Sequence, residues 1–397
     1  MIVVDHVAVL FVELGVLFVA LSVLGVLARR LGLSPVPFVL VTALAFGEGG
    51  IAPLTEAQPF VESAAEIGVV LLLLALGLEF TSTELVSSLR RHGPSGLVDV
   101  ALNAPPGALA GVVLGLSWQG CLALAGITWI SSSGIVARLL DDLGRLANRE
   151  TPSVLSVLVL EDIAMALFLP VLVVSLAGGG PVRAVAGAAV AFGAVALVLL
   201  AAHRHGHRMG RLLSHDDDEQ VVLRLLGITL LVAGIAQALG ASAAVGAFLV
   251  GIAVPSAFAD RARAILRPLR DVFAAIFFVA FGLATDPAAA LPVLHVVLGL
   301  AVVTTVSKMA SGALAARRDR IGRAGQLRAG AALVARGEFS IVIAGLAVAG
   351  GLEEVGVVAT GYVLVMAVTG PVLARYVEPL AARAGVLPRE LVGRRPA

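Results

Sequence analysis

Two adjacent acids, Glu161 and Asp162, lie in the middle of an apolar run of membrane length, VLSVLVLEDIAMALFLPVL at 154–172. A carboxylate near the centre of a bilayer costs on the order of 2.5 kcal/mol or more, so it is normally kept only where it faces a protein interior or a wet cavity. Such a group can hold a proton or a cation. The pair therefore predicts an ion or proton site, and the alternative for Asp162 is a structural carboxylate hydrogen-bonded within a helix bundle.

Lys308 is the only lysine of the chain, and it lies inside another apolar run. A buried ammonium needs a carboxylate. The acids within apolar runs are Glu13, Glu79, Asp99, Glu161, Asp162 and Glu338. We expect Glu161 or Asp162 to be the partner of Lys308. Because consecutive helix positions diverge by about 100°, the two acids cannot both point at one ligand. Glu161 therefore either belongs to the ion site or is a counter-charge to Lys308 or Arg336.

Two further apolar runs, at 121–140 and 326–349, are interrupted by polar residues and glycines that a plain membrane helix would not contain. The interrupting residues are Thr128, Ser131, Ser132, Ser133 and Gly134 in the first run and Arg336, Gly337, Glu338 and Ser340 in the second. Corresponding interruptions in two halves of a chain predict broken helices that line a site near the middle of the membrane. We expect the two to cross beside Asp162. The hydroxyls then bind the ion or serve as hydrogen-bonding glue, and Arg336 with Glu338 forms a structural pair.

The composition fixes the class of protein that must position these residues. Of the 397 residues, 59% are hydrophobic and 14% are charged, whereas a soluble domain carries about 25% charged residues. A lone Cys121 excludes an intrachain disulfide or a cysteine-rich metal site, and a net charge of +1 gives no indication of nucleic acid. The chain is therefore predicted to be an all-α polytopic membrane protein.

Apolar runs of roughly 20 residues, bounded by Gly, Pro and charge, predict about thirteen transmembrane helices. The predicted spans are 7–28, 34–47, 64–80, 96–116, 121–140, 152–176, 182–202, 220–239, 242–257, 268–284, 291–315, 326–349 and 356–376. With the N-terminus outside, 25 of the 28 lysines and arginines fall in inner loops, at the inner ends of spans or in the C-terminal tail. The positive-inside rule therefore predicts an outer N-terminus and a cytoplasmic C-terminus.

Short internal echoes predict two inverted six-helix repeats joined by a linking helix. The sequence at 31–34, LGLS, recurs as LGAS at 239–242, an offset of 208 residues, and ALGL at 75–78 recurs as AFGL at 280–283, an offset of 205. Each echo falls on spans of opposite direction, which is typical of secondary transporters. The 205-residue offset relates Ser132 to Gly337, and Lys308 to Asn103, which lies close to Asp99.

At these residues the chain resembles the monovalent cation:proton antiporter-2 family, which includes bacterial potassium/proton and sodium/proton antiporters. The motifs that carry the resemblance are LLLLALGLEF at 71–80, ISSSGIVARLL before LVLEDIA, LGASAAVGAFLVGI, FFVAFGLATD, the span-11 lysine and ARGEFSIVIA. The resemblance implies dimerisation helices at 1–90 and 203–290, core transport helices at 91–176 and 291–380, a linking helix at 177–202 and a short cytosolic tail at 381–397.

The same resemblance implies exchange of K⁺, with Na⁺ as the alternative, for H⁺ by elevator-type alternating access in a homodimer of the bacterial cell membrane. Asp162 matches the ion-binding aspartate of the family, and Glu161 stands where Gln, Asn or Asp is common. No cofactor and no metal beyond the transported cation is implied. Many relatives carry a cytosolic nucleotide-binding domain after the last span, and this sequence continues only about twenty residues past it. We therefore expect any regulatory sensor to be a separate cytosolic subunit.

Other classes of function are weaker. An intramembrane serine hydrolase built on Ser132 would lack a general base, because no histidine falls near it within a span. A gated cation channel would favour rings of ligands contributed by repeated subunits. His203, His205, His207 and His215, followed by the acids at 216–219, could sense pH, but a charge-rich loop is usually only solvated.

Overall fold

The computed structural model describes residues 6–31, 36–46, 54, 56–78, 82–176, 193, 217–238, 243–283 and 290–385. These residues form α-helices and their connections, with no strand among them, and eight of the helices are long and apolar enough to cross a membrane. The prediction of an all-α polytopic membrane protein is confirmed. The helices are α1 (His6–Leu31), α2 (Val36–Phe46), α3 (Gln58–Leu78), α4 (Ser82–Val113), α5 (Trp118–Trp129), α6 (Ser133–Asp142), α7 (Thr151–Leu176), α9 (Asp218–Ala238), α10 (Ala243–Ala253), α11 (Ser256–Leu283), α12 (Ala290–Arg318), α13 (Arg323–Ala332), α14 (Glu338–Ala349) and α15 (Glu353–Arg383).

Helices occupy every predicted span except 182–202, of which the structure describes residue 193 alone. The four histidines of the 203–215 segment lie outside the described residues. Two of the predicted spans each contain two helices. The run at 121–140 is divided into α5 and α6, and the run at 326–349 into α13 and α14. The polar interruptions therefore mark real helix breaks, while the count of thirteen spans and the inverted repeats stay predictions.

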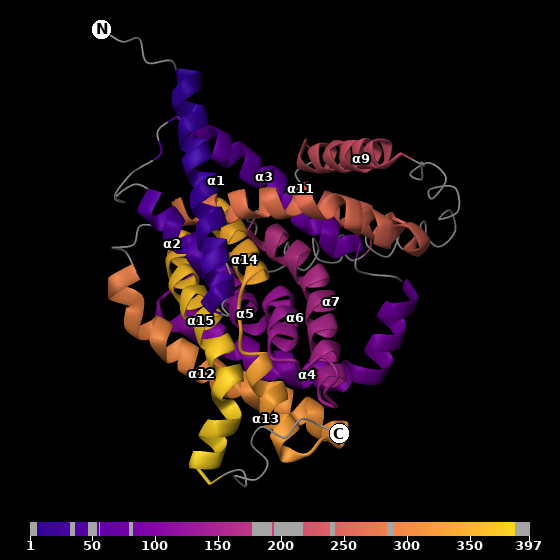
Figure 1. The fold of residues 1–397 in the computed structure, drawn as a ribbon, viewed down its shortest axis with the longest axis vertical. Helices are drawn as coiled ribbons and strands as arrows, with labels where there is room; N and C mark the ends of the chain where they lie inside the picture. The colour runs from indigo at the N-terminus through magenta and orange to yellow at the C-terminus, as the bar shows by residue number, and fades with distance from the viewer. Residues whose placement is uncertain are drawn as a thin grey trace. The chain divides into compact units, whose positions relative to one another are not determined.

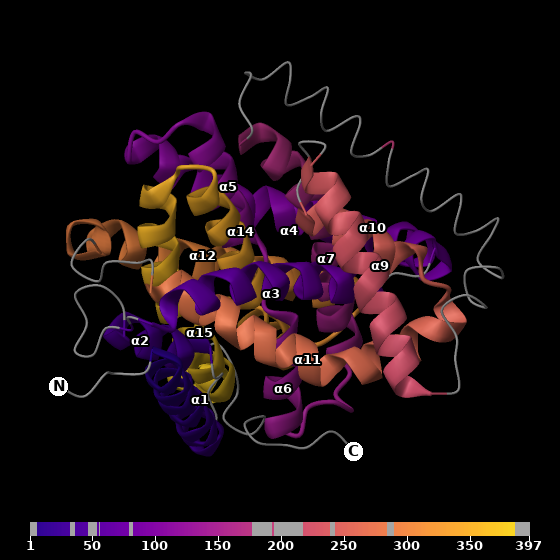
Figure 2. The same ribbon diagram turned by 90° about the horizontal axis from the view of Figure 1, so that it is seen from above.

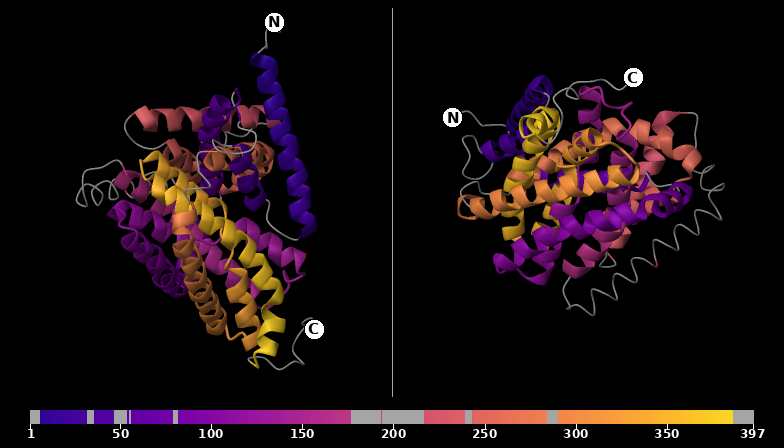
Figure 3. Two further views of the ribbon diagram at one scale, coloured as in Figure 1. Left: turned by 90° about the vertical axis from the view of Figure 1, so that its left-hand side faces the viewer. Right: turned by 90° about the horizontal axis from the view of Figure 1, so that it is seen from below.

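The helices cluster into two units. The first lies within Met1–Leu54, Arg90–Glu161 and Phe281–Ala397, and the second within Thr55–Leu89 and Asp162–Ala280. In the first unit α12, α13 and α15 lie side by side (Figure 1), and α14 packs against α5 and α15. Also in this unit, α2 packs against both α1 and α15 (Figure 3). In the second unit α10 packs against α3 and α9 (Figure 2). The assignment of dimerisation and transport roles to parts of the chain stays a prediction.

Glycines permit the closest helix contacts within each unit. A Cβ atom on Gly312 of α12 would lie 2.7 Å from the Cα atom of Gly330 on α13, and one on Gly77 of α3 would lie 2.8 Å from the Cα atom of Gly251 on α10. Because membrane helices gain no hydrophobic driving force from each other, such small residues favour association by allowing backbone contact. The first contact brings α12, which carries Lys308, directly against α13 and its break.

Candidate functional site

The two helix breaks meet each other within the first unit. The backbone N–H of Ser132, in the α5/α6 break, donates to the carbonyl of Ala335, in the α13/α14 break, at 3.0 Å. The Ser132 hydroxyl also accepts the N–H of Ile135 and so caps the start of α6. Gly337 is required at this approach, because a Cβ atom there would lie 2.6 Å from the Ser132 hydroxyl. The breaks are therefore fixed to each other by backbone as well as side-chain hydrogen bonds.

Arg336 binds the carboxyl ends of two helices at this junction. Its side chain is fully buried, and it donates to the carbonyl of Thr128 at 2.9 and 3.2 Å, to that of Leu333 at 3.0 Å and to that of Val334 at 2.9 Å. Thr128 lies in the last turn of α5, and Leu333 and Val334 follow α13. Carbonyls at a helix end lack partners in the helix and carry partial negative charge. The guanidinium therefore satisfies both ends with a positive charge.

Glu338, in contrast, lies at the amino ends of two helices, α6 and α14. It is the first residue of α14, and its carboxylate accepts the Ser132 hydroxyl at 2.6 Å and the N–H of Gly134, in the first turn of α6, at 3.3 Å. A carboxylate is favourable there because helix amino ends carry partial positive charge. Arg336 and Glu338 were predicted to form a structural pair, whereas each binds a different set of helix ends.

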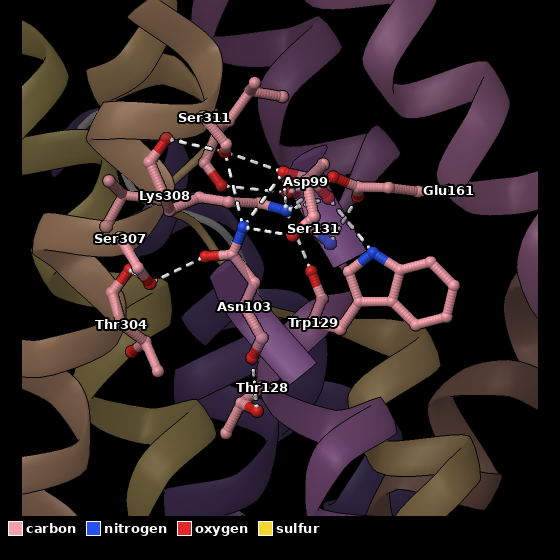
Figure 4. Close-up of polar contacts among 12 residues, drawn as sticks. Asp99, Asn103, Thr128, Trp129, Ser131, Glu161, Thr304, Ser307, Lys308 and Ser311 are labelled. Atoms are coloured by element: carbon pink, nitrogen blue, oxygen red, sulfur yellow. Dashed lines mark hydrogen bonds and ion pairs between the residues drawn. The ribbon is translucent and has the colours of Figure 1, made fainter. Parts of the chain in front are cut away.

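Lys308 lies between two carboxylates in the interior of the first unit (Figure 4). Its ammonium nitrogen is 2.9 and 2.8 Å from the two oxygens of Asp99 on α4, 2.6 Å from Oε1 of Glu161 on α7 and 2.8 Å from the carbonyl of Trp129 at the end of α5. The side chains of Lys308, Asp99 and Glu161 are 0%, 1% and 2% exposed. We call these three residues the central charge cluster.

Asp99 accepts several donors besides Lys308. The Ser311 hydroxyl donates to Oδ1 at 2.7 Å, the amide of Asn103 donates to Oδ1 at 3.0 Å, and the indole N–H of Trp129 donates to Oδ2 at 3.0 Å (Figure 4). Donors from α4, α5 and α12 therefore converge on one carboxylate.

Glu161 connects α7 to both breaks. Its Oε2 accepts the backbone N–H of Ser131 at 2.6 Å, and the Ser131 hydroxyl lies 3.2 Å from Oε1. The same hydroxyl donates to the carbonyl of Leu333 at 2.9 Å, a carbonyl that Arg336 also binds. Glu161, one of the two adjacent acids, is therefore shown in contact with the helix breaks. Asp162, the next residue of α7, is itself buried, with 6% of its surface exposed.

The structure pairs Lys308 with Glu161, one of the two acids expected, and adds Asp99 as a second partner. The sequence analysis included Asp99 among the acids within apolar runs but did not choose it as the partner of Lys308, and it gave Asn103 only a supporting place. The positions of these residues could have indicated the pairing of Asp99 with Lys308. Asn103 corresponds to Lys308 in the proposed repeat, and Asp99 lies one helical turn before Asn103. That spacing puts both side chains on the face of α4 that meets α12.

The predicted hydroxyl ligands have different roles. Ser131 binds Glu161, and Ser132 binds Glu338. The Thr128 hydroxyl donates to the carbonyls of Asn103 and Leu124, at 2.9 and 3.0 Å, so it joins α4 to α5. Ser133 begins α6. Thr128 therefore acts as the hydrogen-bonding glue that was the alternative to ion binding.

Membrane-length helices, two broken helices that meet, and buried charges beside the breaks define a secondary transporter for ions. The family model for the transmembrane sodium/hydrogen exchanger matches residues 16–378, and the chain belongs to this family. It is therefore a cation/proton antiporter and not an enzyme, which confirms the resemblance seen in the motifs.

Individual relatives agree with this assignment. The chain is 32% identical over 381 residues to the K⁺/H⁺ antiporter subunit KhtU of Bacillus subtilis, covering 94% of this chain and 93% of the relative. It is 28% identical to the ammonium/H⁺ antiporter subunit AmhT of Alkalihalophilus pseudofirmus, covering 90% of each. The solved structure of the sodium proton antiporter MjNhaP1 of Methanocaldococcus jannaschii matches with a TM-score of 0.66 at 18% identity, covering 96% of this chain and 99% of that one, and so shares the fold.

Proposed function

We propose that the protein exchanges K⁺ for H⁺ across the bacterial cell membrane, with Asp162 as the carboxylate that holds either the cation or the proton. The observation that carries this proposal is the excess of buried negative charge next to Asp162. In the central charge cluster two carboxylates share one ammonium, and Glu161 is the residue directly before Asp162. Buried negative charge without a matching cation is costly, so it favours binding of a cation or a proton.

K⁺ is preferred to Na⁺ because the relative KhtU is named as a K⁺/H⁺ antiporter and covers nearly the whole chain. AmhT, named for ammonium, supports the same preference, because ammonium and K⁺ are monovalent cations of similar size. We further propose that the helices that carry the breaks move by an elevator-type mechanism. The protein is proposed to be a homodimer, with the N-terminus of each subunit outside. Both relatives are named as antiporter subunits, which supports a separate regulatory subunit.

The test measures proton flux in proteoliposomes. A preset proton gradient should collapse on addition of K⁺, with a lower apparent KM for K⁺ than for Na⁺, and Asp162→Asn should abolish the response. Asp319→Asn is the matched control: it removes the same charge at an exposed connection between α12 and α13. Wild-type exchange in Asp162→Asn would refute the role of Asp162. Equal KM values for K⁺ and Na⁺ would refute the selectivity. A flux that rises without saturation would favour the channel alternative.

A further inference from the structure

The ammonium group of Lys308 makes more contacts with one carboxylate of the central charge cluster than with the other. Lys308 has three N–H donors, and it lies within hydrogen-bond distance of both oxygens of Asp99 but of only one oxygen of Glu161. A further contact goes to the Trp129 carbonyl. By geometry, Asp99 is the principal partner of Lys308.

Asp99 is also the better enclosed of the two carboxylates. Besides Lys308 it accepts hydrogen bonds from Asn103, Trp129 and Ser311, and these donors come from three helices. Glu161 has only the N–H and hydroxyl of Ser131 in addition to Lys308. Charge-assisted hydrogen bonds stabilise an ionised carboxylate. Asp99 therefore makes more hydrogen bonds than Glu161 does, and two of them are to Lys308.

The neighbouring charges at the helix breaks do not alter this balance. Arg336 and Glu338 carry one charge of each sign, and each is bound to helix ends. With its three groups ionised, the central charge cluster has two negative charges against one positive charge. One net negative charge is left, and Glu161, the less enclosed acid, carries it on the helix position directly before Asp162.

We propose that Asp99 is a positioning residue that sets the affinity for the transported cation: by engaging Lys308 it leaves the charge of Glu161 incompletely neutralised beside Asp162. Without Asp99, Lys308 would be free to neutralise Glu161 fully, and the cation would meet a less negative site. Asp99 acts through Lys308 and touches neither the cation nor Asp162. This inference rests on the proposed exchange at Asp162, and it adds the control of cation affinity by a residue of α4.

Transport kinetics test the charge count directly. Asp99→Asn makes the cluster neutral and should raise the KM for K⁺ about tenfold with a much smaller change in kcat, because a unit charge several Å away acts strongly in a low-dielectric interior. The double variant Asp99→Asn with Lys308→Gln restores one net negative charge, so its KM should return to within about threefold of the wild type. Asp319→Asn should leave both constants unchanged.

A KM in the double variant as high as in Asp99→Asn would overturn the inference. If the wild-type protein shows no exchange, the proposed function fails instead.

The state of Lys308 can be measured without transport. Because it is the only lysine in the chain, ¹⁵N-lysine labels a single side-chain nitrogen, and its resonance distinguishes ammonium from amine. In the purified wild-type protein the ammonium signal should persist across the whole pH range in which exchange operates. Conversion to the amine within that range would overturn the inference even if Asp99→Asn fails to fold. In a folded Asp99→Asn protein the resonance should shift, because the principal partner is lost.

Discussion

The first unit contains two groups of opposite charges, one buried and one partly buried, and they differ in charge balance and in access to water. The central charge cluster places Lys308 against Asp99 and Glu161, at 0–2% exposure. A second group, which we call the peripheral charge cluster, consists of Arg145, Glu150, Arg328 and Glu378. Arg328 bridges the two acids, at 2.5 Å to Glu150 and 2.7 Å to Glu378, and Arg145 lies 3.6 Å from Glu378.

The peripheral charge cluster is balanced, with two cations and two carboxylates, and its side chains are 3–15% exposed. It joins the connection between α6 and α7 to α13 and α15, and Arg145 also donates to the carbonyl of Ala374. Balanced, partly hydrated pairs of this kind fix helix ends to one another. Under the function that we propose, the unbalanced central charge cluster would instead be compensated by a bound proton or cation.

The largest expected effect comes from removing the cation of each cluster. Lys308→Gln leaves two carboxylates in a water-excluded interior, and we expect it to cost about 3 to 5 kcal/mol of stability. Arg328→Gln is the matched change in the peripheral charge cluster. There Arg145 still faces Glu378 and water can reach the acids, so we expect a loss of about 1 to 3 kcal/mol. Thermal unfolding midpoints in one detergent measure both. Equal losses would show that the balance of charge does not distinguish the clusters.

The peripheral charge cluster should also give stability a dependence on acid pH. Burial raises the pKa of Glu150, but hydrogen bonds from Arg328 and Asn148 outweigh it, so the pKa of this carboxyl is lowered. A lowered folded pKa stabilises the protein fully above the pKa of the unfolded chain, about 4.3 for Glu, and this stabilisation is lost as the pH falls through the folded value. The gap in melting temperature between wild type and Glu150→Gln should therefore be constant from pH 7 to 6 and close below about pH 4. A gap that stays constant down to pH 3 would contradict the assigned cause.

Sequence patterns predicted the central charge cluster better than the peripheral one, for a physical reason. An ionisable residue inside an apolar run is conspicuous because the membrane makes it costly, so Asp99, Glu161 and Lys308 could each be noticed by residue type alone. Arg145 and Glu378 lie near helix ends, where charges are common and only the folded structure shows which ones meet. The positive-inside pattern treated such arginines as a group and could not identify ion pairs among them.

The helix breaks were also predictable, but their partners were not. Clustered serines and a glycine at 131–134, and the run from Arg336 to Ser340, marked the breaks because such residues are unusual in a plain span. Whether Arg336 would bind Glu338 or backbone carbonyls depends on how the two breaks face each other. That geometry depends on packing between segments some 200 residues apart, as in the hydrogen bond between Ser132 and Glu338, and no local pattern contains it.

The smallest expected effect compares one neutral donor in each cluster. The Ser311 hydroxyl donates to Asp99 at 2.7 Å, and the Asn148 amide donates to Glu150 at 2.8 Å. Ser311→Ala should cost about 1.5 to 2 kcal/mol, because the hydrogen bond is made to a charged group that water cannot reach. Asn148→Ala should cost about 0.5 to 1 kcal/mol, because Arg328 still donates to both oxygens of Glu150 at 2.5 and 3.0 Å. Denaturation midpoints of the two variants against wild type measure the difference. If Asn148→Ala proved the more damaging, water access would not be what separates the two clusters, and the contrast would rest on the charge balance alone.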